Sequence, residues 1–173
     1  VPDHLKDKRP RVDIDFNSGR SKRKDDNMSG YVDEQRQNFK PSVVMESRDG
    51  VYPIYDAKLS ILVTGTSPET GQDVIVYKGE FEDIHLPVNV EKRFEGDAFE
   101  LWFDDEGAMY GFKFKGYHAI LEDPDGKVLA DKHVPSTAAK FVENLQTLTT
   151  GDVYGRDYKK TGTASLERSV KMR

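Results

Sequence analysis

Hydrophobic and polar residues alternate in several short stretches of the chain. In the first stretch, Val12, Ile14 and Phe16 alternate with charged residues, which is the period of a half-buried β-strand. Strand-like patterns of varying regularity follow over 31–47, 57–63, 74–77, 81–90 and 97–104. Pro41 predicts an edge position, a bulge or a break in the first of these, and Pro87 predicts an edge strand or a crossing segment. The pattern therefore predicts a protein built largely from strands.

The strongest strand signal covers residues 109–134. Two hydrophobic runs rich in aromatic and β-branched residues flank the sequence Asp-Pro-Asp-Gly at 123–126. Pro124 suits the first central position of a β-turn, and Gly126 suits a left-handed backbone position. This segment is predicted to be a β-hairpin.

Both ends of the chain and one internal segment lack this pattern. After Ser136, a plausible helix N-cap, hydrophobic residues recur at helical spacing up to Leu148, which predicts one helix of roughly three turns. The polar segment 17–30 is predicted to be a long solvated loop at a mobile hairpin tip. Residues 1–8 are predicted to be a flexible N-terminal segment, 9–148 the folded domain, and 149–173 a flexible or partner-dependent tail.

About seven short strands separated by turns and followed by one helix favour an all-β fold with two antiparallel sheets packed face to face, a β-sandwich. A small barrel is the competing architecture. At 173 residues the chain is long enough for one such domain and short for two.

Charge and composition exclude several functions. The formal net charge of -5 and the pI near 5.4 oppose attraction to nucleic acid or to anionic lipid, so no nucleic-acid partner is predicted. Because cysteine is absent, neither a disulfide framework nor a thiolate site can form. The chain begins at Val1 without a signal-like apolar core, which suggests a trimmed sequence. The missing part could be a signal peptide, a membrane anchor or a disordered start.

Residues 110–135 resemble the last hairpin of small immunoglobulin-like domains found in verrucomicrobial envelope proteins. The strand at 12–16 and the strand end Phe-Lys-Pro-Ser-Val-Val-Met at 39–45 add to this resemblance. It implies an antiparallel immunoglobulin-like β-sandwich in a periplasmic, outer-membrane-associated or extracellular protein of a bacterium. It also implies a role in type IV pilus biogenesis. No catalytic or binding residue follows from it.

The sequence contains no catalytic motif, and no cofactor or metal is predicted. Carboxylates at 123–126 and 104–107 could suggest a cation site, but a β-turn and a solvated loop explain them. His118 and His133 lie on the two strands of the predicted hairpin. With the turn centred on Pro124 and Asp125, His118 is predicted to lie opposite residue 130 or 131 and not opposite His133. These histidines, with His85, are interpreted as surface or core residues.

Two groups of residues are candidate partner contacts. One is a basic cluster, and the other is a set of aromatic residues that would mark an interaction surface if exposed. The candidates are Arg20, Lys22, Arg23 and Lys24 in the first group and Trp102, Tyr110 and Tyr117 in the second.

The leading hypothesis is a non-enzymatic protein-interaction module of a bacterial cell envelope assembly, which binds through a sheet edge or an aromatic face. The alternative is a carbohydrate- or surface-binding module with Trp102 and nearby tyrosines as a platform. An enzyme would need a pocket that joins the histidines to the carboxylates at 104–106.

Overall fold

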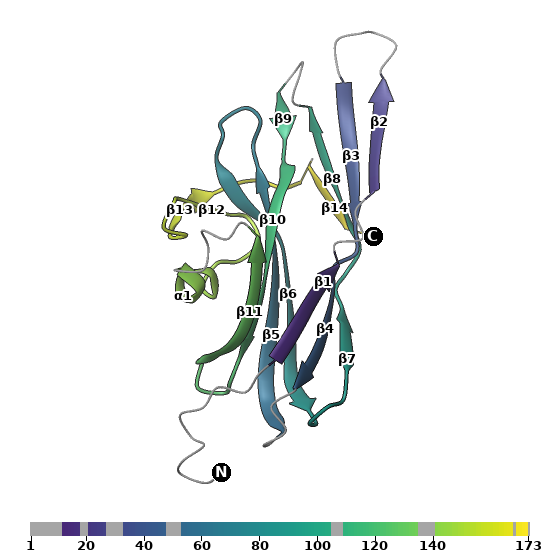
Figure 1. Ribbon diagram of the computed structural model, residues 1–173. Helices are drawn as coiled ribbons and strands as arrows, with labels where there is room; N and C mark the ends of the chain where they lie inside the picture. Colours follow the sequence, from purple (N-terminus) through teal and green to yellow (C-terminus); the bar gives the residue numbers. More distant parts are fainter. Residues whose placement is uncertain are drawn as a thin grey trace.

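The computed structural model describes residues 12–17, 21–26, 33–47, 53–104, 109–134, 141–167 and 169–172. Within these residues nearly all regular structure is β-strand, arranged in three sheets whose neighbouring strands are antiparallel (Figure 1). The all-β class predicted from the alternating pattern is confirmed.

The largest sheet has six strands and contains the predicted hairpin. Their order is β11 (Val128–Val134), β10 (Lys113–Glu122), β5 (Ile54–Thr66), β6 (Asp73–Leu86), β12 (Asp152–Tyr154) and β13 (Lys160–Thr163). The sequence predicted two separate strands over 74–77 and 81–90, but β6 is one continuous strand that ends just before Pro87. Its pairing with β5 across the intervening residues supplies the backbone hydrogen bonds that the local sequence pattern does not reveal.

Two smaller sheets lie end to end beside the six-stranded sheet (Figure 1). One consists of β1 (Val12–Asn17), β4 (Ser42–Ser47) and β7 (Lys92–Glu95). The other consists of β14 (Val170–Met172), β8 (Phe99–Asp104), β3 (Asp33–Phe39) and β2 (Ser21–Asp26), with β9 (Tyr110–Gly111) paired to β8.

The chain passes between the two smaller sheets at two adjacent places. Pro41 separates β3 from β4, and Gly96 separates β7 from β8. The Gly96 amide donates a hydrogen bond to the Pro41 carbonyl at 2.8 Å, which joins the two crossings. Of the edge position, bulge or break predicted at Pro41, the structure has a break, and it is the point at which the chain changes sheets.

Tyr77 of β6 holds these crossings against the six-stranded sheet. Its hydroxyl accepts a hydrogen bond from the Asp97 amide at 2.9 Å. Its ring stacks on Phe99 at 5.0 Å, Phe99 on Phe39 at 5.1 Å, and Phe39 on Phe114 at 5.2 Å. These rings belong to the main core, which combines buried residues of all three sheets. Burial raises the pKa of the Tyr77 hydroxyl, which therefore stays protonated.

The turn at 123–126 forms as the sequence predicted. Gly126 has a φ of 85°, and its amide donates to the Asp123 carbonyl at 3.0 Å. The Asp123 carboxylate accepts the amides of Asp125 and Lys127, both at 2.9 Å. These carboxylates are therefore part of a turn.

Three local predictions need correction. The segment 17–30, predicted to be a solvated loop, contains β2, which pairs with β3 along its whole length. The segment 149–173, predicted to be a flexible or partner-dependent tail, contributes β12, β13 and β14 to two sheets. These strands have little hydrophobic alternation, and β12–β14 are only three or four residues long. They adopt the strand conformation because neighbouring strands pair with them, and the local sequence pattern does not indicate it.

The predicted helix is also shorter than expected. The α-helix α1 covers only Val142–Leu145, a single turn. Ser136, its predicted N-cap, lies outside the described residues. Leu145 and Leu148 are buried on the sheet, so the helical spacing marked the residues that pack but not the length of the helix.

Gly111→Ala should destabilise the fold strongly. Gly111 has a φ of 81°, and a Cβ atom there would lie 2.0 Å from the Trp102 carbonyl oxygen. The strained backbone and the clash together should cost at least about 2 kcal/mol in the free energy of unfolding, measured by urea denaturation. Gly126→Ala is the matched control, because it has a similar φ of 85° but open space around the Cβ. Equal losses in both variants would contradict the clash.

Tyr77→Phe should lower the free energy of unfolding by about 1 kcal/mol, since it removes the hydrogen bond to the Asp97 amide and keeps the ring stack. Tyr77→Ala should cost about 3–5 kcal/mol because it also removes the ring. Chemical denaturation measures both. A Tyr77→Ala protein as stable as Tyr77→Phe would show that the stack does not hold the sheets together.

Candidate functional site

The outer face of the six-stranded sheet, opposite the main core, is covered over only part of its length. Near α1 it is buried under a second hydrophobic cluster, formed by Leu62, Ile75 and Ile120 of the sheet with Leu145, Leu148, Tyr154 and Tyr158. Toward the start of β5 and the end of β6 the same face carries charged and aromatic residues that are exposed or half-buried. We call this part the open face and define it by Tyr55, Asp56, Lys58, Glu82, Asp83, His85, Glu122 and Asp123.

A group of ion pairs marks the boundary between the covered and open parts. The Lys78 ammonium donates to the carbonyl oxygens of Leu148 at 2.7 Å and Gln146 at 3.3 Å, which fastens the end of the helical segment to β6. Glu80 lies 3.4 Å from both Lys78 and Lys58. Partial burial opposes ionisation of Glu80, but the two ammonium groups outweigh it and lower the pKa of this carboxyl.

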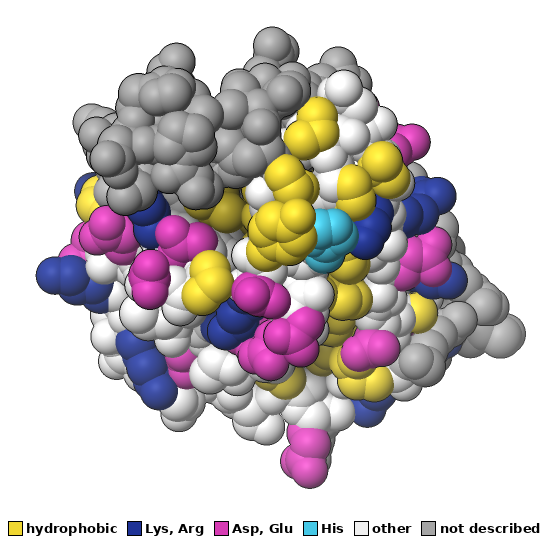
Figure 2. All heavy atoms as spheres, turned by 90° about the horizontal axis from the view of Figure 1, so that it is seen from below, with side chains coloured by type: hydrophobic (Ala, Val, Ile, Leu, Met, Phe, Trp, Pro, Cys, Tyr) yellow, Lys and Arg dark blue, Asp and Glu magenta, His cyan; other side chains and the backbone are white. Residues whose placement is uncertain are grey.

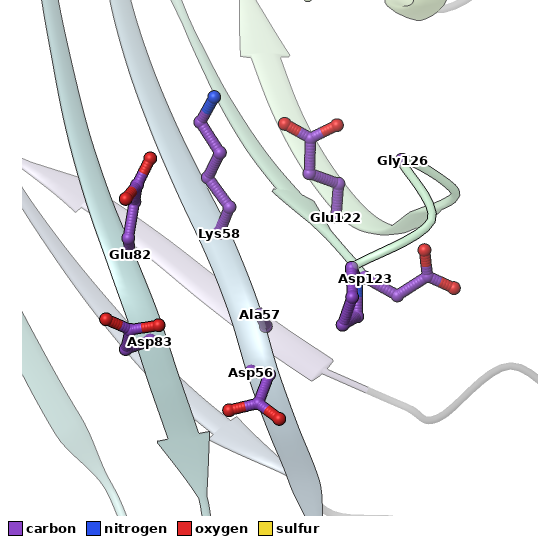
Figure 3. Close-up of a pocket in the computed structure, with 9 residues that line it drawn as sticks. Asp56, Ala57, Lys58, Glu82, Asp83, Glu122, Asp123 and Gly126 are labelled. Atoms are coloured by element: carbon purple, nitrogen blue, oxygen red, sulfur yellow. The ribbon is translucent and has the colours of Figure 1, made fainter.

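Beyond these ion pairs the open face contains a hollow of about 330 Å³. Figure 3 shows carboxylates from three strands and the hairpin turn around it: Asp56, Glu82, Asp83, Glu122 and Asp123, with Lys58 among them. We call this set the carboxylate hollow. Glu122 accepts a hydrogen bond from the Gln146 amide at 2.7 Å, and Asp123 accepts the two amides of its turn.

Backbone irregularities place two of these carboxylates. Asp56 and Asp83 have φ values of 51° and 53°, and the β5–β6 register shifts between Ile54 and Leu59. Such bulges insert extra residues and redirect side chains. Asp and Asn tolerate this left-handed conformation better than most residues. Consequently both side chains are exposed at the same end of the open face.

Next to the hollow, an aromatic ring is exposed to solvent. Tyr55 is 59% exposed, and its ring lies 4.4 Å from the His85 ring on the neighbouring strand. Figure 2, seen from the end of the molecule where β5 begins and β6 ends, shows hydrophobic side chains gathered beside a histidine and close to a group of Asp and Glu side chains. The open face therefore combines an apolar aromatic surface with negative charge.

The aromatic residues predicted as partner contacts lie elsewhere. Trp102 of β8 is half-buried, and the Arg36 guanidinium lies over its ring at 4.0 Å from the centroid. Tyr110 of β9 is half-buried, and Tyr117 of β10 packs against the main core. The three do not form one exposed platform. Their role as partner contacts stays a prediction.

The basic candidates fall on β2 or outside the described residues. Lys22, Arg23 and Lys24 lie on this edge strand, opposite Gln37, Arg36 and Gln35 of β3 in register. Arg20 lies outside the described residues. Their role as partner contacts also stays a prediction.

Sequence reasoning missed Tyr55, and it interpreted His85 as a surface or core residue without a role in binding. The pattern predicted a strand from residue 57, whereas β5 begins at Ile54. The extra residues of the bulge interrupt the alternation, so the hydrophobic pattern does not place Tyr55 on the exposed face of the sheet. Its only signal was a tyrosine next to a charged residue at the edge of a hydrophobic run.

The histidines correct a second prediction. The sequence placed His118 opposite residue 130 or 131, but it pairs directly with His133. The pairing at the turn is centred on Asp125, where Glu122 lies opposite Val128, and a bulge between Leu121 and Glu122 shifts the register by one further residue. His85 is separate from this pair and lies at the Tyr55 end of the sheet. Of the predicted carboxylate cluster, Asp104 is buried on β8, and 105–106 lie outside the described residues. The three hollows described on the surface are lined neither by these histidines nor by Asp104.

His118 is a buried titratable group on the six-stranded sheet. It is 1% exposed, its ring meets Tyr158 edge-on at 5.8 Å, and neither ring nitrogen has a hydrogen-bond partner there. Burial, and then the positive charge of His133 and Lys115, lower its pKa from 6.5 to about 4.

Acid should therefore destabilise the protein through His118. The unfolded chain binds this proton more tightly than the folded protein does, so the contribution is complete above pH 6.5 and is lost as the pH falls toward 4. Urea denaturation between pH 7 and pH 4 should show a loss that His118→Leu reduces by up to about 3 kcal/mol. His85→Gln is the control. A His118→Leu protein with the full wild-type pH dependence would contradict this assignment.

No group of three or more His, Asp or Glu residues in the described ranges is arranged to hold a metal ion. Nor does any described helix have the length and hydrophobicity needed to cross a membrane. The chemistry that the open face offers is thus attraction of positive charge combined with an apolar aromatic contact.

Comparison with known proteins assigns no family. No family model matches the chain, and no curated protein matches it. Among solved structures, a crystal structure from Akkermansia muciniphila, a verrucomicrobe, aligns with 82% of this chain and 79% of its own at 13% sequence identity and a TM-score of 0.39. A TM-score this low does not establish a shared fold.

Proposed function

We propose that the protein is a non-enzymatic protein-interaction module of a bacterial cell envelope assembly and that the open face is its contact surface. The observation that carries this proposal is the exposed Tyr55 ring, which lies against the His85 ring on the sheet face that contains the hollow. Tyrosine is enriched at protein interfaces because its ring buries a large apolar area while its hydroxyl forms hydrogen bonds.

The architecture supports this role. The open face lies on two long central strands, β5 and β6, whose other face is anchored in the main core. A surface built on such strands is more rigid than one built on loops and loses less conformational entropy on binding. The ion pairs of Glu80 and the helical segment border it on one side.

The finer parts of the proposal come from the sequence. The resemblance of 110–135 to immunoglobulin-like domains of verrucomicrobial envelope proteins supports an immunoglobulin-like β-sandwich, a periplasmic or surface location, and a part in type IV pilus biogenesis. The alternative, a carbohydrate-binding module centred on Trp102, has less support, because Arg36 lies over that ring.

A photo-crosslinking amino acid at position 55, introduced into the protein in its own bacterium, tests the proposal. A defined adduct with an envelope protein, identified by mass spectrometry, is the expected result. The matched control is the same amino acid in place of Glu69, which is exposed in the turn at the other end of the β5–β6 hairpin. Absence of an adduct from position 55, or the same adducts from both positions, would refute the open face as the contact surface.

A further inference from the structure

We propose that the partner presents a positively charged segment to the open face, with an arginine or lysine side chain in the carboxylate hollow and against the Tyr55 ring. This inference rests on the proposed function and adds the chemistry of the partner to it. Three features of the open face carry it: the unbalanced charge of the hollow, the direction of Lys58, and the position of the aromatic pair.

The charge of the hollow is not neutralised by the described residues. Its lining has five carboxylates and a single ammonium group, that of Lys58. Lys58 is engaged by Glu80 at 3.4 Å, which lies outside this lining. Glu122 and Asp123 accept hydrogen bonds from neutral amides. The remaining three, Asp56, Glu82 and Asp83, have no ion pair with any described residue.

The Lys58 side chain fills only part of the hollow. The part that it does not reach lies toward Tyr55 and His85. Figure 3 shows the Lys58 side chain extending along β5 away from Asp56 and Asp83, between Glu82 and Glu122. Asp56 directly follows Tyr55 in the sequence, and Asp83 precedes His85 by two residues. A cation that enters between Asp56 and Asp83 is therefore attracted by both carboxylates without displacing Lys58.

The Tyr55 ring favours a cation that also has an apolar part. A guanidinium or ammonium group is attracted to the face of an aromatic ring, and arginine can stack on the ring while it donates to a carboxylate. The His85 ring lies 4.4 Å from the Tyr55 ring, and this contact restricts the tyrosine side chain before binding. Arginine should bind more tightly than lysine for this reason.

Charge complementarity also argues for a basic protein segment over other partners. The same carboxylates repel anionic lipid headgroups and nucleic acid, in agreement with the net charge of -5. The described residues do not form a group suited to a metal ion. A sheet face with a hollow of about 330 Å³ has room for a long basic side chain, while the exposed Tyr55 offers apolar contact to its neighbours in the segment.

The test uses fluorescently labelled nonapeptides made of Arg-Gly-Phe, Lys-Gly-Phe or Glu-Gly-Phe repeats, titrated with the purified protein and followed by anisotropy. The arginine peptide should bind more tightly than the lysine peptide, the glutamate peptide should not bind, and added salt should weaken binding. The double variant Asp56→Asn/Asp83→Asn should lower affinity at least about tenfold, and Tyr55→Ser about fivefold.

Two controls separate the site from general attraction. Asparagine tolerates the left-handed backbone at 56 and 83, so the double variant should keep its fold, which circular dichroism checks. The matched variant Glu69→Gln/Glu95→Gln removes the same charge from exposed residues outside the open face and should retain affinity within about twofold. Equal losses in both double variants, or no binding of the arginine peptide, would overturn the inference. Equally tight, competing binding of spermine would assign the hollow to a free polyamine and also overturn it.

The results distinguish this inference from the proposed function. If position 55 crosslinks to an envelope protein but no basic peptide binds, the proposed function stands and the inference fails. If the basic peptide binds through Asp56 and Asp83 but position 55 gives no adduct, the charge chemistry stands and the envelope interaction fails.

Discussion

The Tyr77 side chain crosses the core from the six-stranded sheet to the place where the chain passes between the two smaller sheets. There its hydroxyl accepts the Asp97 amide, and its ring begins the stack that continues through Phe99 and Phe39. Because both crossings, at Pro41 and Gly96, are joined by a hydrogen bond at this point, one side chain positions the ends of both smaller sheets. Close packing of three aromatic rings leaves little freedom for the sheets to shift.

This arrangement gives the two faces of the six-stranded sheet different roles. The inner face is committed to the main core along the length of β5 and β6. The outer face needs cover only where its residues are hydrophobic, and there the C-terminal segment and α1 supply it through Leu145, Leu148 and Tyr158. Lys78 fastens this cover to β6 through two carbonyl oxygens. Where the outer residues become charged, the cover ends and the open face begins.

The open face is thus a rigid surface that does not contribute to the core. Its irregular backbone at Asp56 and Asp83 is held by regular pairing on both sides, between Leu59 and Phe81 and between Ile54 and Leu86. Residues with positive φ cost free energy and persist only where the surroundings hold them, so they often occur at functional positions. Here they set two exposed carboxylates beside an exposed aromatic ring. This combination is the physical basis of the function that we propose.

The sequence by itself determined the all-β class, the hairpin around 123–126 and an irregularity of the strand at Pro41. Each of these depends on a local cause: period-two alternation, the φ preferences of proline and glycine, or the missing amide of proline. In β8, Phe99, Leu101 and Phe103 stand at alternate positions, and all three are buried.

Only the tertiary structure decided the rest, because those features depend on partners distant in the sequence. The strands β2, β12 and β14 lack alternation and exist through pairing with β3, β6 and β8, and β13 exists through pairing with β12. A bulge of a single residue brought His118 opposite His133, and another exposed Tyr55, since one residue more or less moves a side chain to the opposite face of a strand. The candidate site lies where such bulges meet, and local patterns do not encode a register that is fixed by the packing of the whole sheet.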